Sequence, residues 1–250
     1  MIETIGLTKT FRDKKRGTVV AAQELNFRCE PGKIFGLLGP NGAGKTTTLR
    51  MLSTVLKPTK GTAVVNGFDV ATQPDAVRRQ IGFLSCDTGL YPRLTAREMV
   101  RYFGQLYGMR KDILDSRTSE IFRMLDMEDF LDVRNDRLST GMKQKVSIAR
   151  AIIHNPPVMI FDEPASGLDI IGSRMIYDFV RTCRNQGKTV VFSTHVLSEA
   201  EKLCDIIAII NKGKILDLGT LTELKGRTSK DNLEDVFIHL VGEKDETEKH

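Results

Sequence analysis

A glycine-rich segment at residues 39–46, which reads GPNGAGKT, restricts the possible folds of this chain more than any other feature. Its spacing, G-x-x-x-x-G-K-[ST], is that of a phosphate-binding loop, in which small residues allow successive backbone amides to point at phosphate oxygens. The motif requires a strand before it and a helix after it. Both are indicated, because the apolar run Ile34–Leu38 precedes the loop and Leu49, Leu52 and Leu56 follow it at helical spacing. The segment predicts an α/β fold that binds a phosphorylated ligand; the alternative is a glycine-rich turn without a ligand.

The polar residues of this loop have distinct expected roles. Lys45 would neutralise the β- and γ-phosphates of a nucleotide, and the hydroxyl of Thr46 can ligate Mg²⁺. The positive end of the following helix adds to the attraction for phosphate. The residues expected to bind the nucleotide here are Gly39, Pro40, Asn41, Gly42, Ala43, Gly44, Lys45, Thr46 and Thr47.

An apolar run at residues 158–161 ends in two carboxylates, Asp162 and Glu163. At the tip of a strand, Asp162 can hold Mg²⁺ through water, and Glu163 can orient and deprotonate an attacking water molecule. Two solvated acids at a strand end would be the alternative interpretation. With a phosphate-binding loop in the same chain, the pair instead predicts hydrolysis of a nucleotide.

The segment 138–145, which reads LSTGMKQK, begins a helical pattern. Ser139, the Gly141 amide and the positive end of that helix form a second candidate anion site. This segment resembles the signature sequence of ABC ATPases, where LSGG is commoner, and the chain from about Met1 to Gly242 resembles one ABC cassette. In that family the signature loop faces the γ-phosphate bound by the other subunit. The resemblance therefore implies a head-to-tail dimer that closes over two ATP molecules, with Ser139 and Gly141 as nucleotide contacts. Because one chain carries every motif apart from the unusual loop after residue 85, a homodimer suffices; a heterodimer is the alternative.

Further motifs follow in the order that the family has. Residues 166–169, SGLD, resemble the D-loop, which crosses the dimer interface, and residues 193–195, STH, resemble the switch region. The resemblance implies that His195 contacts the γ-phosphate and holds Glu163 and water in geometry, so Glu163, His195 and Lys45 are the expected catalytic residues. Phe11 falls where the family keeps an aromatic that stacks on adenine; the alternative is a phenylalanine that only packs in a sheet.

The loop after residue 85 departs from the family. Members usually have glutamine there, and alignment of the preceding IGFL at residues 81–84 places Cys86 at that position. A thiol is a poor ligand for Mg²⁺. Asp87 can replace the amide oxygen with a carboxylate if the loop shifts by one residue, or it can cap the turn at residues 87–89. Asp87 is therefore a candidate metal ligand with a structural alternative.

Several features together resemble the NatA-type proteins, which are ATP-binding subunits of sodium-extruding exporters. These features are the unusual loop, the signature segment, the pair Cys204-Asp205 and the segment 233–237, LEDVF. Close relatives of that type export drugs, lipids or polysaccharides. No pattern in the chain selects Na⁺, so sodium export is implied by the resemblance alone.

The order of apolar patterns predicts the architecture. Strand-like alternation covers the first 30 residues, helical spacing covers about Tyr91 to Asn155, and strands and helices alternate after Asn155. The resemblance implies a P-loop NTPase with a mixed, mainly parallel core sheet, an N-terminal antiparallel β subdomain and an inserted helical subdomain. We expect one domain over residues 1–242, with a core at about 1–85 and 156–230 and a helical subdomain at about 86–155. A charged, disordered tail is expected at residues 243–250.

Two helices have more detailed predictions. Thr95 and Glu98 have the spacing of a capping box at a helix N-terminus. In a later helix, one apolar face is expected to contain Ile171, Met175, Phe179 and Cys183.

Composition limits the class of protein but does not identify the partner that it binds. The 250 residues are 40% hydrophobic and 28% charged, which is ordinary for a globular protein, and no apolar run reaches the roughly 18 residues that span a bilayer. The four cysteines are dispersed and predict neither a zinc site nor a disulfide framework, which favours a reducing compartment. The net charge of +5 permits a nucleotide, a nucleic acid or a membrane surface as partner.

A transporter function would require separate membrane-spanning permease subunits. We expect the chain in the cytoplasm, held at the cell membrane by such subunits through the loop 86–94 and through Leu90, Tyr91 and Phe103. The rival interpretation is a soluble ABC ATPase that acts on nucleic acid or ribosomes. Such proteins usually join two cassettes or carry a long coiled coil, which this sequence lacks, so no nucleic-acid partner is expected. The signature segment also argues against a P-loop kinase or GTPase.

Overall fold

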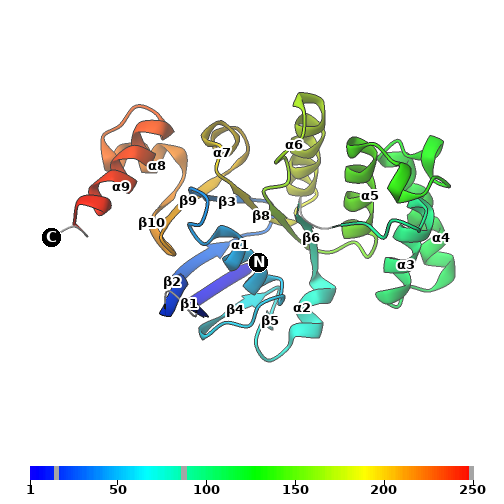
Figure 1. Cartoon of the computed structure of the whole chain (residues 1–250), viewed down its shortest axis with the longest axis horizontal. Coiled ribbons are helices and arrows are strands. Elements are labelled where there is room, and N and C mark those ends of the chain that lie inside the picture. The colour runs from blue at the N-terminus through cyan, green and yellow to red at the C-terminus, as the bar shows by residue number, and fades with distance from the viewer. Residues whose placement is uncertain (14–16, 86–88, 248–250) are drawn as a thin grey trace.

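The computed structural model describes residues 1–13, 17–85 and 89–247 of the chain (Figure 1). The strands are β1 (Ile2–Asp13), β2 (Gly17–Cys29), β3 (Ile34–Leu38), β4 (Lys60–Val65), β5 (Phe68–Asp69), β6 (Ile81–Ser85), β7 (Val158–Asp162), β8 (Thr189–Thr194), β9 (Ile206–Asn211) and β10 (Lys214–Gly219). The helices are α1 (Lys45–Leu52), α2 (Pro74–Gln80), α3 (Ala96–Leu106), α4 (Lys111–Met124), α5 (Thr140–Ile152), α6 (Ile170–Asn185), α7 (Leu197–Leu203), α8 (Leu221–Thr228) and α9 (Leu233–Thr247).

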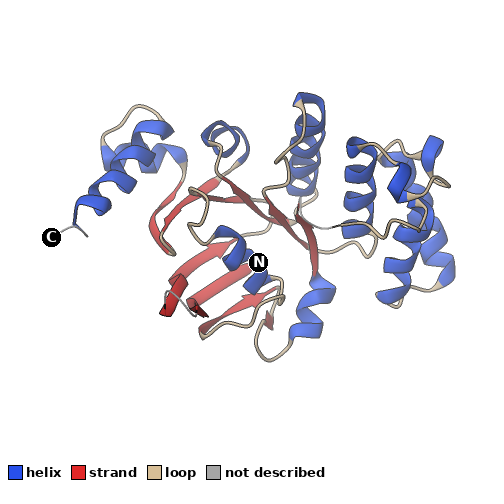
Figure 2. Cartoon of the chain, in the orientation of Figure 1, coloured by secondary structure: helices blue, strands red, loops and turns tan. Residues whose placement is uncertain are grey.

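The strands of the described residues form two sheets (Figure 2). The N-terminal sheet has four strands in the order β2-β1-β4-β5, and its neighbours are antiparallel. The core sheet has six strands in the order β10-β9-β3-β8-β7-β6, and only the edge strand β10 runs antiparallel to its neighbour. The mixed, mainly parallel core sheet and the antiparallel N-terminal sheet confirm the predicted fold class.

Both faces of the core sheet are covered, which explains the continuous apolar runs of its strands. Along β7, Val158 and Ile160 pack in one cluster with α1 and the N-terminal sheet. Met159 and Phe161 point to the other face and pack in a second cluster with residues of α5 and α6. In Figure 1, α1 lies between the two sheets, while α6 and α7 lie on the opposite side of the core sheet.

The helices α3, α4 and α5 lie between β6 and β7 in the sequence and form a separate lobe at one end of the molecule (Figure 1). An inserted helical subdomain is expected at this place in the chain. The predicted capping box begins this lobe: the Thr95 side chain accepts from the backbone N–H of Glu98, and the Glu98 carboxylate accepts from the N–H of Thr95. Among the described residues, no helix is long and apolar enough to cross a membrane.

Three local predictions are wrong in detail. The helix α1 ends at Leu52, because Thr54 adopts a left-handed backbone conformation, and Leu56 therefore lies beyond the helix. Ile171 was expected on a buried helix face but is 81% exposed, since the buried residues of α6 begin only at Ile176, after its first turn. The tail is helical as far as Thr247, because buried residues anchor the start of α9 and a nucleated helix extends readily; residues 248–250 lie outside the described part.

Some elements are absent from the sequence-based prediction. The short helix α2 and the edge strand β10 have little periodic apolar patterning, and β6 is only 5 residues long. The basic segment at residues 12–17 reads RDKKRG, and its described residues Asp13 and Gly17 pair across the antiparallel strands β1 and β2. Residues 14–16 of that segment lie outside the described residues.

Candidate functional site

Parallel pairing brings the carboxyl ends of three strands together. Leu38 of β3 is paired with Thr194 of β8, and Ser193 of β8 is paired with Asp162 of β7. The glycine-rich loop, the two carboxylates and the switch segment leave the sheet at these three adjacent ends. Segments far apart in sequence therefore meet at one edge, where ligands of open α/β sheets bind.

The glycine-rich loop is shaped by close backbone contacts. A side chain at Gly39 would place its Cβ 2.2 Å from the Ile210 carbonyl oxygen, and one at Gly44 would place it 2.3 Å from the Ala21 carbonyl oxygen. Gly44 also has a φ of +107°, which strains any other residue. The first turn of α1 has neither a side-chain cap nor an acidic residue, so its orphan N–H groups remain available to an anion. This loop fits a phosphate group.

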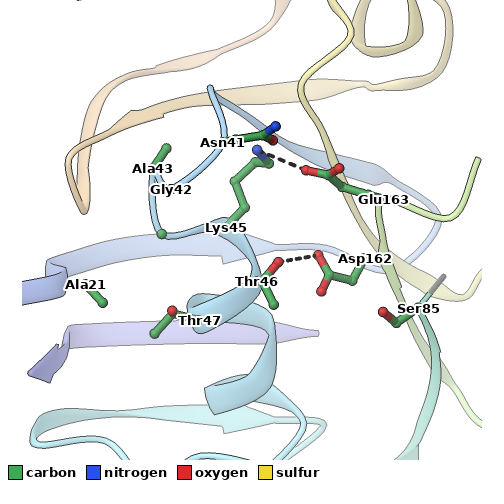
Figure 3. A pocket seen from close by; sticks show the side chains of 11 residues that line it. Ala21, Asn41, Gly42, Ala43, Lys45, Thr46, Thr47, Ser85, Asp162 and Glu163 are labelled. Atoms are coloured by element: carbon green, nitrogen blue, oxygen red, sulfur yellow. Dashed lines mark hydrogen bonds and ion pairs between the residues drawn. The ribbon is translucent and has the colours of Figure 1, made fainter. Parts of the chain in front are cut away.

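Lys45 begins α1 and points back across the loop (Figure 3). Its Nζ donates to the carbonyl oxygens of Gly39 at 2.7 Å and Pro40 at 3.0 Å, and lies 3.1 Å from Glu163 Oε1. The lysine side chain is 4% exposed and the glutamate side chain 21%. A buried ammonium group needs such partners, and phosphate oxygens can replace them.

Thr46, Asp162 and Ser193 form a second polar group. The Thr46 hydroxyl donates to Asp162 Oδ1 at 3.1 Å, and the Ser193 hydroxyl donates to the same oxygen at 2.8 Å. Burial raises the pKa of Asp162, and the two hydroxyl hydrogen bonds oppose that rise. The part of the chain that the structure describes has no cluster of three or more His, Cys, Asp or Glu side chains for a metal. One hydroxyl and one carboxylate nevertheless fit Mg²⁺, which usually takes few protein ligands beside water and phosphate oxygens.

Glu163 links the strand end to the switch segment. Its backbone N–H donates to Ser193 Oγ at 3.0 Å, and its φ of +45° is left-handed, which is rare for a glutamate. This conformation turns the side chain so that Oε1 meets Lys45 and Oε2 lies 3.0 Å from His195 Nδ1. The arrangement gives a carboxylate that can accept a proton, beside a cation and a histidine that fix its position.

A pocket of about 280 Å³ contains most of these groups (Figure 3). Its lining residues are Ala21, Asn41, Gly42, Ala43, Gly44, Lys45, Thr46, Thr47, Ser85, Asp162 and Glu163. Phe11 is not among them. It lies on β1, is 39% exposed, pairs with Val19 of β2, and has the Lys9 ammonium 5.3 Å from its ring centroid. The exposed ring remains compatible with a stacked base and with simple sheet packing.

The signature segment lies apart from this pocket. Ser139 caps α5, and its hydroxyl accepts from the Met142 N–H at 3.3 Å. Ser139 and Gly141 line a hollow together with Gly167 and Asp169 of the segment that resembles a D-loop. No residue lines both this hollow and the phosphate pocket. The structure therefore does not bring Ser139 and Gly141 to Lys45 within one chain.

Two further positions complete the predicted set. Cys86 and Asp87 lie outside the described residues, so Asp87 stays a prediction. The residue before them, Ser85, pairs with Asp162 in the sheet and lines the phosphate pocket. Sequence reasoning gave no role to Ser193, which joins Asp162 to Glu163; a hydroxyl residue at the end of an apolar strand next to a histidine was the available signal.

Comparison with a family model and with known proteins gives ABC transporter proteins in both cases. The family model described as "ABC transporter" matches residues 22–166. The chain is 39% identical over 239 residues to the ABC transporter ATP-binding protein NatA of Bacillus subtilis (strain 168), covering 95% of this chain and 97% of that protein.

Solved structures are similar over nearly the same length. The structure of an ATP-binding subunit of an ABC transporter has a TM-score of 0.86 and 28% identity, covering 96% of this chain and 99% of that one. The dimeric structure of the bacterial ABC transporter cassette MJ0796 has a TM-score of 0.79 and 28% identity, covering 88% and 99%.

Proposed function

Because this chain belongs to the ABC transporter family and is one of its ATP-binding, ATP-hydrolysing subunits, we propose that it energises export through separate membrane-spanning subunits, with Na⁺ as the exported ion. The observation that carries the proposed chemistry is the contact of Glu163 with both Lys45 and His195 beside the glycine-rich loop. Sodium as cargo is supported by the resemblance of the sequence to NatA-type proteins.

Each residue of the site has a separate role in ATP hydrolysis. The loop from Gly39 to Thr47 holds the phosphates, and Lys45 exchanges its loop carbonyl and carboxylate partners for phosphate oxygens. Glu163 is then free to accept the proton of the attacking water, and His195 holds it in place. Thr46 and Asp162 would hold Mg²⁺, which supplies charge stabilisation for the transferring phosphoryl group.

Asp87 is proposed as a further Mg²⁺ ligand. If it is one, Asp87→Ala raises the Mg²⁺ concentration needed for half-maximal ATPase activity. An unchanged Mg²⁺ dependence would leave Asp87 as a turn residue.

The proposed active form is a homodimer. The phosphate pocket and the hollow with Ser139 and Gly141 share no residue, and each is half of the composite site implied by the family. One chain carries both halves, so two copies placed head to tail complete two equivalent sites. The similarity to the dimeric cassette supports the same arrangement.

The proposed surface for the membrane subunit is a groove between the core and the helical lobe. Phe103 of α3 lines it, together with Val55 and Phe83. Val55 is 64% exposed. Tyr91 does not line the groove, but it is 50% exposed and its ring packs edge-to-face on Tyr102 of α3. Apolar groups exposed beside a groove suit a helix of a partner, and we place the chain at the cytoplasmic face of the membrane through this contact.

The test of this function is purification of the tagged chain with its partners from detergent-solubilised native membranes, followed by reconstitution in vesicles. We expect a polytopic membrane protein at stoichiometric yield and ATP-dependent movement of Na⁺. The variant Glu163→Gln should keep the partner and lose the movement. Recovery only with ribosomes or nucleic acid would keep the ATPase chemistry and overturn the transport function.

A further inference from the structure

Three consecutive residues at the end of β8 each make a hydrogen bond in a different direction. Ser193 donates to Asp162, and His195 contacts Glu163 through Nδ1. Between them, the buried Thr194 turns away from the phosphate pocket and donates to Glu199 Oε2 of α7 at 2.5 Å. The Thr194 hydroxyl also accepts from the Val196 N–H at 2.9 Å, so it closes the turn that carries His195.

Glu199 joins this turn to another helix. While Oε2 accepts from Thr194, Oε1 accepts from the Tyr177 hydroxyl of α6 at 2.6 Å. Burial and the neighbouring Glu199 raise the pKa of Tyr177 to about 12, so the phenol stays protonated and donates. Both carboxylate oxygens are thus engaged by hydroxyl groups from two different elements, which holds the carboxylate in one orientation.

The contact continues towards the first turn of α6. Ser173 lies one helical turn before Tyr177 on α6. Its backbone N–H donates to the carbonyl of Asp169, the residue that caps α6 and ends the segment resembling a D-loop. Hydrogen bonds therefore run from Tyr177 of α6 through Glu199 to the turn that carries His195, and the helix itself connects Tyr177 to Asp169.

We propose that Tyr177 and Glu199 are positioning residues for hydrolysis, which hold the turn at Thr194 so that His195 meets Glu163 and which join that turn to α6. Neither residue touches the phosphate pocket, so both act through His195. The inference rests on the proposed roles of Glu163 and His195.

The packing of the two helices allows the hydroxyl to be removed without unfolding. Buried apolar residues of α6, including Ile176 and Val180, pack against the core sheet, and Ala200 and Leu203 bury one face of α7. Tyr177→Phe deletes one oxygen from this region and keeps the ring. The matched control is Tyr102→Phe, which makes the same chemical change at a ring that is 40% exposed in the helical lobe.

The experiment compares ATP hydrolysis by the full-length wild type, Tyr177→Phe and Tyr102→Phe. Loss of a hydrogen bond to a charged group predicts a kcat about tenfold lower in Tyr177→Phe, with KM for ATP changed less than twofold and Tm preserved. Tyr102→Phe should match the wild type. Glu199→Gln should lower kcat similarly, and the two changes together should cost less than the product of their separate effects.

A second measurement is independent of activity. The ¹⁵N resonances of the His195 ring, assigned among the four histidines with His195→Ala, report its contact with Glu163 in the nucleotide-free protein. We expect them to shift in Tyr177→Phe and not in Tyr102→Phe.

Unchanged kcat and unchanged His195 resonances in Tyr177→Phe would overturn the positioning role. A lower kcat with equal losses in ATP affinity or Tm would also overturn it, because it would show only structural damage. Normal turnover in Glu163→Gln would refute the proposed chemistry itself, whereas loss of turnover there with a fully active Tyr177→Phe would refute only this inference.

Discussion

The variant Glu163→Gln tests the site most directly, because Glu163 has a different partner on each carboxylate oxygen. Oε1 lies 3.1 Å from Lys45 Nζ, and Oε2 lies 3.0 Å from His195 Nδ1. Glutamine keeps the volume of the side chain and an oxygen that can accept from Lys45. It removes the negative charge and the ability to accept a proton from water.

Two effects of different size are expected. A positioned general base contributes about 10²- to 10⁴-fold to a rate, so turnover should fall by at least about a hundredfold. Affinity for nucleotide should rise, because phosphate must displace Glu163 from a lysine that is 4% exposed. The gross attraction of such a pair is about 4 kcal/mol, but desolvation cancels most of it. A net competition of about 1 kcal/mol corresponds to roughly fivefold tighter binding.

The two effects are measured separately. Phosphate release under saturating MgATP gives turnover, and calorimetry with a non-hydrolysable ATP analogue gives affinity for both wild type and variant. Glu30→Gln is the matched control, since Glu30 is a solvated carboxylate that pairs with Arg28 and has a side chain 61% exposed. It should change neither quantity.

Each result can refute a different part of the reasoning. Turnover within a few fold of wild type would remove Glu163 as the base. Lost turnover with unchanged or weaker analogue binding would refute the competition between Glu163 and phosphate for Lys45. A change of the same size in Glu30→Gln would attribute the binding effect to net charge rather than to the site.

Further predictions concern nucleotide binding and stability. Lys45→Ala should weaken ATP binding by about 10- to 100-fold in calorimetry, since it removes a charged contact to phosphate; unchanged binding would contradict the phosphate-loop assignment. Phe11→Ala should weaken ATP binding by about fivefold or more if the ring stacks on adenine, while the affinity for inorganic triphosphate stays the same. Asp162→Asn should raise the Tm of the nucleotide-free protein, because burial raises the pKa of Asp162 and the ionised carboxylate therefore destabilises the fold at neutral pH; a lower Tm would contradict this. Burial lowers the pKa of His154 to about 4. As the pH falls from about 6.5 to 4, His154 therefore binds a proton in the unfolded chain but stays neutral in the folded protein. The free energy of unfolding should therefore fall by up to about 3 kcal/mol over that window in denaturant titrations, and His154→Gln should lessen the fall.

The fold was predictable where local pattern and burial agree. The apolar run of β3 and the carboxylate-tipped run of β7 are buried on both faces, so their sequences have little choice of structure. Prediction failed where tertiary context determines exposure. Ile171 has the spacing of a buried face, but no residue of the first turn of α6 is buried, and the charged end of α9 is helical because its first turn is anchored against α7.

The sequence by itself determined the phosphate loop, because the spacing of Gly39, Gly44, Lys45 and Thr46 within eight consecutive residues supplies small residues, a cation and a hydroxyl for phosphate without any distant residue. It also determined which residue types are available for catalysis. Only the tertiary structure decided that Glu163 meets Lys45 and that Glu199 supports the turn of His195. Those contacts join residues that are distant in sequence through the register of parallel strands and the packing of helices on them, and neither can be read from spacing along the chain.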